Sequence, residues 1–492
     1  MTALDSYISQ VAATAAPPVH RAAQPTATRR DPVGPGTYLA FCTGWLMAVS
    51  LFVYAPLRML SWAGEQFLAG RAAAATVAIL LAGAGLLGGV RWCAFSLMAL
   101  WNHRRDVARP LAPPLHWPRV SILAPAYNEG DTIEAAIESL LAMDYPSYEV
   151  VVVDDGSRDE TLRRARRYAG DYADGRRRCT VRVFTKPNGG KWSALNYAFE
   201  RSSGELVLCV DADSRVVGDS LRRLVARMND PSVAAVAGQV RVRNRVNLVT
   251  RLQGLEYIIA NGLIRTAQSL SGTVLVVPGP IGLFRRSVME GVYLSAAAER
   301  ESSACDVACE GDVAGPFEGD TFAEDFDMSL AILAQGGRVV YEPRAVSHTK
   351  APEGVARLLN QRYRWSRGTI QVLRKFARRA RRRPELLHPR LAAWLSVTYV
   401  AELLLLPLLN LVAAAFTCTY LAGGGDVAPL LAWAAAFMLV NANAATFFAA
   451  LHEEPPTALA VLPIYDLYHS VLLNAGWAIA VVDELRRTRM RW

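Results

Sequence analysis

Cysteine is scarce in this sequence of 492 residues, and its seven copies occur at irregular spacing. Several of them, including Cys42, Cys93 and Cys418, lie inside apolar segments, which excludes the disulfide framework of a small secreted protein. Cys305 and Cys309 form a CxxxC pair, but no second pair or nearby histidine completes a zinc set. Plain loop thiols are favoured there over a metal or redox role. The soluble part of the chain is therefore expected in the cytosol.

Zinc-finger, RNP and helix-turn-helix signatures are missing too, although the formal net charge is +9. Much of the basic excess lies beside apolar segments, as in residues 374–383, where seven of ten residues are Lys or Arg. This placement is typical of the cytoplasmic rim of a membrane protein, with anionic lipid headgroups rather than nucleic acid as partner. With 52% hydrophobic residues, the chain is too apolar for a purely soluble protein.

The sequence divides into four regions. Residues 1–36, rich in Ala, Pro, Thr and Arg, predict a disordered cytoplasmic tail. Residues 37–102 predict two transmembrane helices, because they contain two uncharged or nearly uncharged runs long enough to span a bilayer. Residues 103–385 predict a cytoplasmic α/β domain, and residues 386–492 predict a C-terminal transmembrane region with three to four hydrophobic passes.

The number of C-terminal passes stays open. Apolar stretches cover residues 391–422, 427–451 and 457–482, and three crossings would leave the basic tail at 486–491 outside, against the positive-inside tendency. Either 391–422, which is long and contains a proline, passes twice, or 457–482, which contains an aspartate and a histidine, is interfacial or re-entrant.

The α/β domain shows short Val/Ile-rich runs alternating with charged, helix-like stretches, which predicts βαβ units and a mostly parallel sheet. Strands are predicted at Val120–Ala126, Glu149–Asp154, Val181–Thr185, Glu205–Asp211 and Val233–Val240. Helices are predicted near 131–142, 159–170, 191–202 and 217–228. Ligands of such sheets bind at the carboxyl ends of the strands, where these runs place their polar residues.

Polar side chains follow the first two predicted strands. The first ends in SILAPAYNE, with Tyr127, Asn128 and Glu129, and the second ends in VVVDDGS, with Asp154 and Asp155. Carboxylates at that position can accept hydrogen bonds from a base N–H or from ribose hydroxyls. An ordinary Asx turn or helix cap is the alternative.

The next two motifs point to a diphosphate and a metal ion. KPNGGKWSALN sets a Gly-Gly turn before Lys191, where backbone N–H groups and an ammonium can meet phosphate, although the Walker spacing is missing. ELVLCVDADS ends a strand in Asp211 and Asp213. Magnesium and manganese prefer such carboxylate oxygens, which they share with substrate phosphates. A metal site is favoured there over a solvated turn.

Downstream, PGPIGLFRR offers Gly279 and Phe284 to line an extended acceptor, and GDTFAEDFDMSLAIL places Glu324 and Asp325 before an amphipathic helix. A carboxylate within reach of an acceptor hydroxyl can act as general base. Acidic residues that merely favour a helix N-terminus are the alternative reading of this segment.

The motif QRYRWSRG places Gln361, Arg364, Trp365 and Gly368 on one face of a helix. Arginine there can neutralise a leaving diphosphate, and tryptophan offers a flat surface for a sugar ring. A basic helix at the membrane interface is the alternative.

In this order, AYNE, VDDGS, NGGKxxALN, DAD, FRR, AED and QRYRW resemble the processive family 2 glycosyltransferases, the group of cellulose, hyaluronan, chitin and poly-N-acetylglucosamine synthases. The resemblance covers about residues 119–375 and is closest in wording to the poly-N-acetylglucosamine synthases. It implies a GT-A (Rossmann-like) domain inserted between N- and C-terminal transmembrane helices, and a Mg²⁺ or Mn²⁺ cofactor.

The resemblance also implies a role for each motif. Asp213, with Asp211, would hold the metal, Asp325 would act as base with Glu324 beside it, and either Asp154 or Asp155 would bind uracil. The further donor-binding residues would be Tyr127, Asn128, Glu129, Lys191, Asp211 and Arg364. The acceptor and polymer would contact Gln361, Trp365, Gly279 and Phe284.

The expected function is inverting transfer from a UDP-sugar, with UDP-N-acetylglucosamine as the best guess, into an extracellular β-linked polysaccharide. Bacterial inner-membrane location, membrane lipids and an accessory export subunit belong to that expectation. A glucan or hyaluronan-like synthase using another UDP-sugar, or a non-processive enzyme acting on a lipid carrier, is the alternative. Residues 295–317 resemble an insertion. Neither a PilZ-like domain nor an FxVTxK gating loop is found, so control by a cyclic dinucleotide is not expected.

Overall fold

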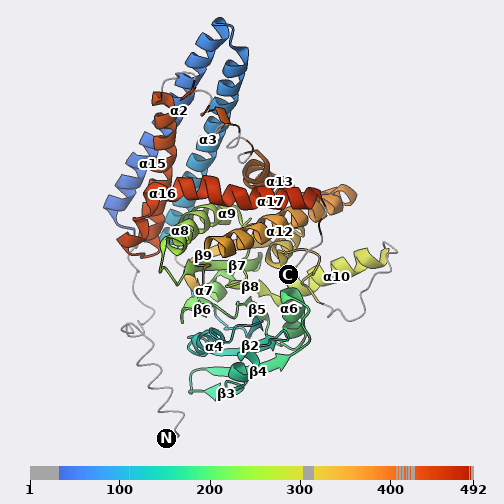
Figure 1. Ribbon diagram of the computed structural model, residues 1–492. Coiled ribbons are helices and arrows are strands. Elements are labelled where there is room, and N and C mark those ends of the chain that lie inside the picture. Colours follow the sequence, from blue (N-terminus) through green and yellow to red (C-terminus); the bar gives the residue numbers. More distant parts are fainter. Residues whose placement is uncertain are drawn as a thin grey trace.

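The computed structural model describes residues 33–109, 111–302 and 315–405, scattered positions between 408 and 422, residues 427–486 and residue 488. The predicted tail up to residue 32, the Cys305–Cys309 pair and most of the inserted segment beyond residue 302 lie outside the described residues. Figure 1 shows long helices standing on one side of an α/β domain.

The α/β domain contains a nine-stranded mixed sheet in the order β3-β4-β2-β1-β5-β8-β7-β9-β6. The strands are β1 (Val120–Ala126), β2 (Ser147–Asp154), β3 (Gly170–Ala173), β4 (Arg178–Thr185), β5 (Leu206–Cys209), β6 (Arg215–Val216), β7 (Val233–Val242), β8 (Gly282–Arg285) and β9 (Arg338–Thr349). β1 pairs in parallel with β2 and with β5, and β2 pairs in parallel with β4. Strand order therefore reverses at β1, which makes the end of β1 the switch point of the sheet.

Helices cover both faces of the sheet. One face carries α4 (Ile133–Leu141), α5 (Thr161–Arg166) and α7 (Ser220–Arg227). The other face carries α6 (Lys191–Glu200), α8 (Leu248–Glu256), the π-helix η1 (Tyr257–Ile264), α9 (Arg265–Ser271), α10 (Arg286–Ser302), α11 (Glu324–Ala334) and α12 (Val355–Arg382). Val150 and Val152 of β2 pack on the first face, and Val151 and Val153 on the second. Burial on both faces explains why this strand is a continuous apolar run.

Among the described residues, two helices are long and apolar enough to cross a membrane, α2 (Pro35–Leu68) and α3 (Ala72–Ala108). They pack beside α15 (Ala428–Leu451), where the Asn443 side-chain amide donates to the Phe41 carbonyl at 3.0 Å. α3 extends six residues past the predicted boundary at 102, because Asp106 near its end pairs with Arg227 of α7 at 2.7 Å. The second helix therefore runs into the α/β domain.

The chain returns to the α/β domain directly after α15. The His452 carbonyl accepts from Arg241 of β7 at 2.6 Å, and Glu454 pairs with Arg245 at 2.7 Å. After the 3₁₀ turn η4 (Pro456–Leu459), residues 462–485 are helical without a break, as α16 (Leu462–Leu467), the π-helix η5 (Tyr468–Leu473) and α17 (Asn474–Leu485).

α17 lies along α12 (Figure 1). The Tyr363 hydroxyl of α12 donates to Asp483 at 2.9 Å, and Arg367 pairs with Glu484 at 3.3 Å. After α12, the chain forms η2 (Pro384–Leu386), α13 (Pro389–Leu395) and the π-helix η3 (Ser396–Leu405). α12 is thus enclosed between the sheet domain and segments from the C-terminal region.

The five predicted strands are all present, but the sheet is mixed and not mostly parallel. Four of the eight strand pairings are antiparallel, because β8 enters between β5 and β7 and the short β3 and β6 pair at the edges. The helix predicted at 159–170 ends at Arg166, and β3 begins at Gly170.

Candidate active site

Three acidic segments meet where the strand order reverses. Asn128 and Glu129 follow β1, Asp154 ends β2, and Asp211 follows β5. The register pairs Ala126 with Asp154 and Leu123 with Cys209, so the ends of these strands lie together at one edge. This is the edge at which parallel sheets bind ligands.

The two neighbouring aspartates after β2 differ in their contacts. Asp155 accepts from the backbone N–H groups of Gly189 at 3.0 Å and Gly190 at 2.8 Å, and pairs with Lys186 at 2.7 Å. Its carboxylate therefore holds the Gly-Gly turn in place. Asp154 is 1% exposed and accepts from Thr185 at 2.9 Å through Oδ2, whereas its buried Oδ1 has no partner among the described residues.

The loop after β1 is attached to the loop after β2. Asn128 adopts a positive φ of 55°, its N–H donates to Ser157, and its side-chain oxygen accepts from the Arg158 N–H, both at 2.9 Å. Asparagine tolerates this left-handed conformation better than most residues. Tyr127 remains 45% exposed at the rim. The sequence could not distinguish these structural roles from ligand contacts.

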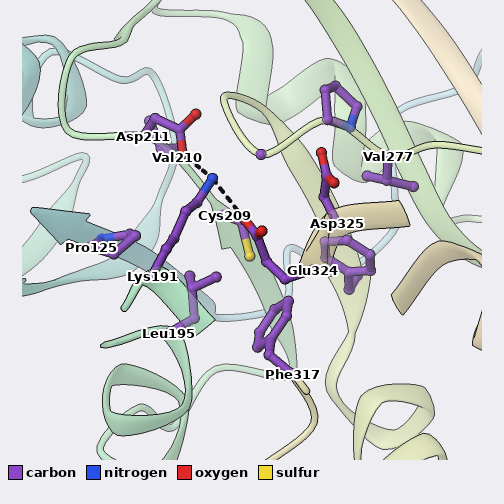
Figure 2. A pocket seen from close by; sticks show the side chains of 13 residues that line it. Pro125, Lys191, Leu195, Cys209, Val210, Asp211, Val277, Phe317, Glu324 and Asp325 are labelled. Atoms are coloured by element: carbon purple, nitrogen blue, oxygen red, sulfur yellow. Dashed lines mark ion pairs between the residues drawn. The ribbon is translucent and has the colours of Figure 1, made fainter. Parts of the chain in front are cut away.

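Lys191 joins two distant acidic segments at the start of α6. Its ammonium lies 2.7 Å from Asp211 Oδ1 and 2.9 Å from Glu324 Oε1 (Figure 2). Although burial opposes the shift, the charges of Asp211 and Glu324 raise the pKa of Lys191 well above its ordinary value. A Cβ on Gly279 would lie 2.7 Å from this ammonium, so a larger residue would displace the end of the lysine side chain. The lysine is thus a fixed cation in the site.

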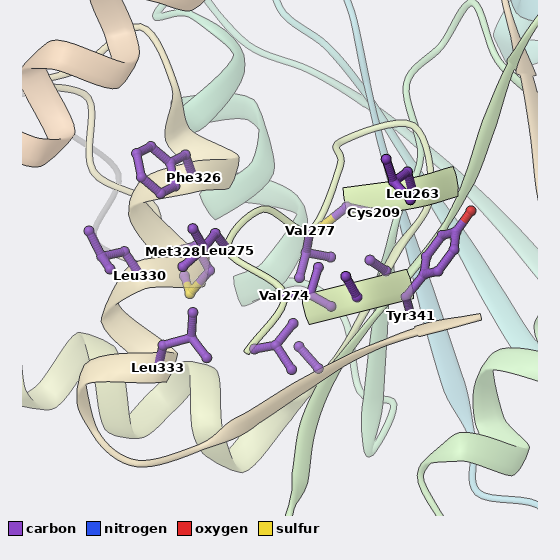
Figure 3. Close-up of a cluster of buried hydrophobic side chains, with 14 of the residues drawn as sticks. Cys209, Leu263, Val274, Leu275, Val277, Phe326, Met328, Leu330, Leu333 and Tyr341 are labelled. Atoms are coloured by element: carbon purple, nitrogen blue, oxygen red, sulfur yellow. The ribbon is translucent and has the colours of Figure 1, made fainter. Parts of the chain in front are cut away.

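Asp325 follows Glu324 at the beginning of α11. Burial and the negative charge of Glu324 raise its pKa to about 6, although Lys191 opposes the shift. The Phe326 N–H donates to Asp325 at 2.8 Å, and Phe326 is buried in the cluster of Figure 3 with Leu275 and Leu330. This packing fixes the helix start, so the carboxylate has a defined position and a pKa suited to proton transfer near neutrality.

A second group of carboxylates repel one another beside this pocket. Asp213 accepts from Ser214 at 3.0 Å and from Thr349 at 3.3 Å, and burial together with the charge of Asp211 raises its pKa. Burial and the charges of Asp213 and Asp211 also raise the pKa of Glu129, against the hydrogen bond from Thr132. A divalent cation would relieve this excess of negative charge, so these carboxylates fit a metal ion.

One narrow pocket brings together six of the predicted residues, namely Lys191, Asp211, Gly279, Phe284, Glu324 and Asp325. Phe284 is only 2% exposed and belongs to its buried wall. The other predicted residues do not line this pocket: Tyr127, Asn128, Glu129, Asp154, Asp155, Asp213, Gln361, Arg364 and Trp365.

The QRYRWSRG segment lies on α12 and contacts the loop before Asp325. A Cβ on Gly368 would lie 2.9 Å from the Ala323 side chain, and Gln371 accepts from the Phe322 N–H at 3.2 Å. Arg364 and Trp365 are exposed, and the Arg362 guanidinium stacks 4.3 Å from the Trp365 ring centre. Of the residues predicted to share one helix face, Gly368 therefore contacts the loop, whereas Arg364 and Trp365 face solvent.

The comparisons with known proteins agree with this geometry. The sequence profile of the family described as "Glycosyl transferase family 2" matches residues 121–292. Residues 121–292 form a family 2 glycosyltransferase domain. The match includes the ends of β1, β2 and β5 and therefore Asp154, Lys191 and Asp211.

Two curated relatives are similar to this chain over a longer stretch than the family profile. A poly-beta-1,6-N-acetyl-D-glucosamine synthase of Staphylococcus aureus is 30% identical over 255 residues, which cover 52% of this chain and 55% of that protein. An N-acetylglucosaminyltransferase of a Rhizobium species is 34% identical over 262 residues, covering 52% and 53%. The chain thus spans about half the length of the curated relatives it matches.

A solved structure supports the fold of the glycosyltransferase domain. The mannosyltransferase PcManGT of Pyrobaculum calidifontis, in complex with GDP-Man and Mn²⁺, is 25% identical with a TM-score of 0.55. The similarity covers 83% of this chain and 100% of that one. The expected GT-A-like α/β fold is therefore confirmed, with the mixed sheet described above.

Sequence reasoning missed several residues that form the pocket of the glycosyltransferase domain. Pro125, Leu195, Cys209 and Phe317 line it together with the predicted residues. Asn196, inside the NGGKWSALN motif, donates to the Phe317 carbonyl at 2.8 Å and accepts from its N–H at 2.9 Å. Asn196 could be noticed because it belongs to the motif. Its partner Phe317, 121 residues away, could not be predicted from the sequence.

Lys375 was also missed, although it attaches α12 to the acidic residues on both sides of Asp325. Its ammonium contacts Glu318, Asp320 at 2.8 Å and Asp327 at 2.6 Å. The carboxylate oxygens of these three residues all lie within 4.8 Å of one another. The lysine thus supplies the cation that this acidic group requires, and a metal ion is not needed there.

Replacing Lys375 with methionine should lower the thermal unfolding midpoint of the purified protein, because three carboxylates would lose their shared cation. Removal of one partner of a buried ion pair costs about 3 kcal/mol or more. Calcium at millimolar concentration should restore part of the loss in this variant beyond its effect on the unmodified protein. Arg378→Met, on the exposed side of the same helix, is the control. Equal midpoints for both variants would contradict this role of Lys375.

Proposed function

We propose that this protein transfers a sugar from a nucleotide diphosphate donor to a growing carbohydrate, with inversion at the anomeric carbon, and so makes a β-linked polysaccharide. The observation that carries the proposal is the Lys191 ammonium between Asp211 and Glu324, with Asp325 beside it, in a pocket at the carboxyl edge of the sheet. UDP-N-acetylglucosamine is the proposed donor. The names of both curated relatives support it.

Asp154 is proposed as the residue that binds the nucleobase. Its buried Oδ1 has no partner among the described residues and can accept from a base N–H. The carboxylate of Asp155 is already engaged by Gly189, Gly190 and Lys186, so we assign it a structural role. The exposed ring of Tyr127 is proposed to cover the donor from the rim.

Asp211 and Asp213 are proposed to hold Mg²⁺ or Mn²⁺, with Glu129 close by. The ion would supply positive charge to the diphosphate of the donor. Support comes from the raised pKa of Asp213 and Glu129, and from the Mn²⁺ present in the solved mannosyltransferase. Lys191 contributes a second, fixed positive charge on the side of the pocket that faces Glu324.

Asp325 is proposed as the general base. It removes the proton from the acceptor hydroxyl while the oxygen attacks the anomeric carbon and the bond to the diphosphate breaks. Because the attack comes from the face opposite the diphosphate, one displacement inverts the configuration without a covalent enzyme intermediate. Glu324 holds the Lys191 ammonium and keeps the pKa of Asp325 raised.

The acceptor is proposed to pass between Phe317 and α12. Trp365 is 45% exposed, and its ring is free to stack on a sugar on the side away from Arg362. Gln361 and Arg364 precede it on the same helix, and we assign them to the acceptor and to the leaving diphosphate. An oligosaccharide held at this mouth would remain bound between additions, which is the basis of processive synthesis.

The membrane helices are proposed to export the product. α2, α3, α15 and the stretch around 391–422 would then be four crossings of the bacterial inner membrane, with the glycosyltransferase domain in the cytoplasm. Support comes from the end of α15, which returns to β7 through the Arg241–His452 and Arg245–Glu454 contacts. α17 would lie at the interface beside α12, and the basic tail would stay inside, as the positive-inside tendency requires.

The proposed donor and polymerisation can be tested with purified protein, Mg²⁺ or Mn²⁺, and a panel of UDP- and GDP-sugars. Nucleoside diphosphate release and product length are followed together. Long polymer from UDP-N-acetylglucosamine supports the proposal, and long polymer from another donor keeps the mechanism but changes the sugar. A single lipid-linked sugar would instead support a non-processive enzyme, and absence of release with every donor would contradict transferase activity.

Asp325→Asn should lower turnover by about 10²- to 10⁴-fold, the usual contribution of a general base. Calorimetric titration with UDP should still show binding, because the base contacts the acceptor and not the nucleotide. Asp171→Asn on the edge strand β3 serves as the matched control and should keep full turnover. Retained turnover in Asp325→Asn would remove this residue from the role.

The pH profile should report the same carboxylate. A base must be deprotonated, so kcat/KM should be constant well above the pKa of about 6 and fall tenfold per pH unit well below it. Lys191 lowers the pKa of Asp325, and Lys191→Gln should therefore move this limb to higher pH. A limb that does not move in this variant would assign the titration to another group.

The side of the membrane on which the C-terminus lies tests the proposal of four crossings. A fluorescent protein fused after Trp492 should be fluorescent in the bacterial cytoplasm, and alkaline phosphatase fused there should be inactive. A phosphatase fused between α2 and α3, at Gly70, should be active and provides the control. Active phosphatase at the C-terminus would require an odd number of crossings.

A further inference from the structure

A second cavity lies on the side of α12 that faces away from the catalytic pocket. It has a volume of about 920 Å³, is open on one side, and is lined by residues of α12, α13, η3 and α17. Its walls include Leu373, Phe376, Leu395, Tyr399, Trp477 and Val481. None of these residues lines the pocket that contains Asp325.

The walls of this cavity favour a hydrocarbon chain over water. Ordered water requires two to four polar partners, and aliphatic and aromatic side chains dominate this lining. The indole Nε1 of Trp477 is buried and has no acceptor among the residues that the structure describes. A ligand for this space is therefore mainly apolar and carries at least one hydrogen-bond acceptor.

The charges at the rim select an anionic headgroup. Arg374 and Arg381 line the cavity together with Glu484. Glu484 is shared by Arg367 at 3.3 Å and Arg374 at 3.4 Å, so its negative charge is already balanced. Arg381 is exposed, so the rim carries more positive than negative charge. Arginines of this kind bind phosphate oxygens.

We propose that this cavity binds an anionic phospholipid of the surrounding membrane, with an acyl chain between α12 and α17 and the phosphate on Arg374 and Arg381. The inference rests on the proposed function in one respect only, namely that α12 and α17 lie at the cytoplasmic surface of the bilayer. A headgroup there carries the phosphate, and the apolar cavity takes a chain of the same molecule.

The bound lipid would act on the catalytic loop through α12. The opposite side of this helix contacts the loop at three points: Gly368 packs on Ala323, Gln371 accepts from Phe322, and Lys375 pairs with Asp327. Asp325 lies between these contacts. A filled cavity therefore supports the face of α12 that positions the base, and we expect anionic lipid to activate the enzyme.

Native mass spectrometry of the delipidated full-length protein tests binding without any activity measurement. Phosphatidylglycerol should be retained at least tenfold more than phosphatidylcholine of the same chain length. The double variant Arg374→Gln/Arg381→Gln should lose this preference, whereas Arg378→Gln, on the same helix but outside the cavity lining, should keep it. Equal retention of both lipids, or a double variant that behaves like the control, would overturn the proposal.

A second variant tests the cavity itself. Ala377 lines it, and Ala377→Trp should fill the space and reduce retention of phosphatidylglycerol without lowering the unfolding midpoint. Unchanged retention in this variant, or a co-purified peptide in place of lipid, would also overturn the proposal. In nanodiscs, phosphatidylglycerol should raise turnover of the unmodified enzyme but not of Ala377→Trp. Lipid binding without sugar transfer from any donor would contradict the proposed function and leave the lipid site standing.

Discussion

The ion pairs of Lys191 connect the parts of this site that are most distant in sequence. Lys191 is the first residue of α6, Asp211 lies two residues after β5, and Glu324 is the first residue of α11. One ammonium therefore connects α6, the end of β5 and α11. Without this cation, Asp211, Glu324 and Asp325 would be neighbouring carboxylates in a buried pocket. Their mutual repulsion would then oppose closure of the pocket. Gly279 allows the approach, because a larger residue would displace the ammonium from this position.

α12 makes contacts of two different kinds. Toward the sheet it packs closely on the loop before Asp325 through Gly368 and pairs with Asp327 of α11 through Lys375. Toward α17 it contributes Leu373 and Phe376 to an apolar cavity with arginines at its rim. The same helix therefore contacts both the loop before Asp325 and the C-terminal helices.

The strands of the first half of the sheet could be predicted because each is an apolar run that ends in polar residues. Four strands were not predicted: β3 and β6 are short edge strands, β8 has four residues between β5 and β7, and the twelve-residue β9 is interrupted by Glu342 and Arg344. In the site, the motifs predicted Lys191, Asp211, Glu324 and Asp325 as neighbours. They could not separate Asp154 from Asp155, because the difference is which carboxylate the Gly189–Gly190 turn engages. Lys375 carried no sequence signal, since it lies within a basic run.

The contacts at the end of α15 connect the sheet domain to a helix from the C-terminal region. Arg241 of β7 donates to the His452 carbonyl, and Arg245 pairs with the nearly buried Glu454. Arg241 of β7 and Arg245 just after it thus receive their partners from residues more than 200 positions later in the chain. The α/β domain and the segment after α15 are therefore joined by polar contacts. A protein cut at residue 385 would lack part of its own interior polar network.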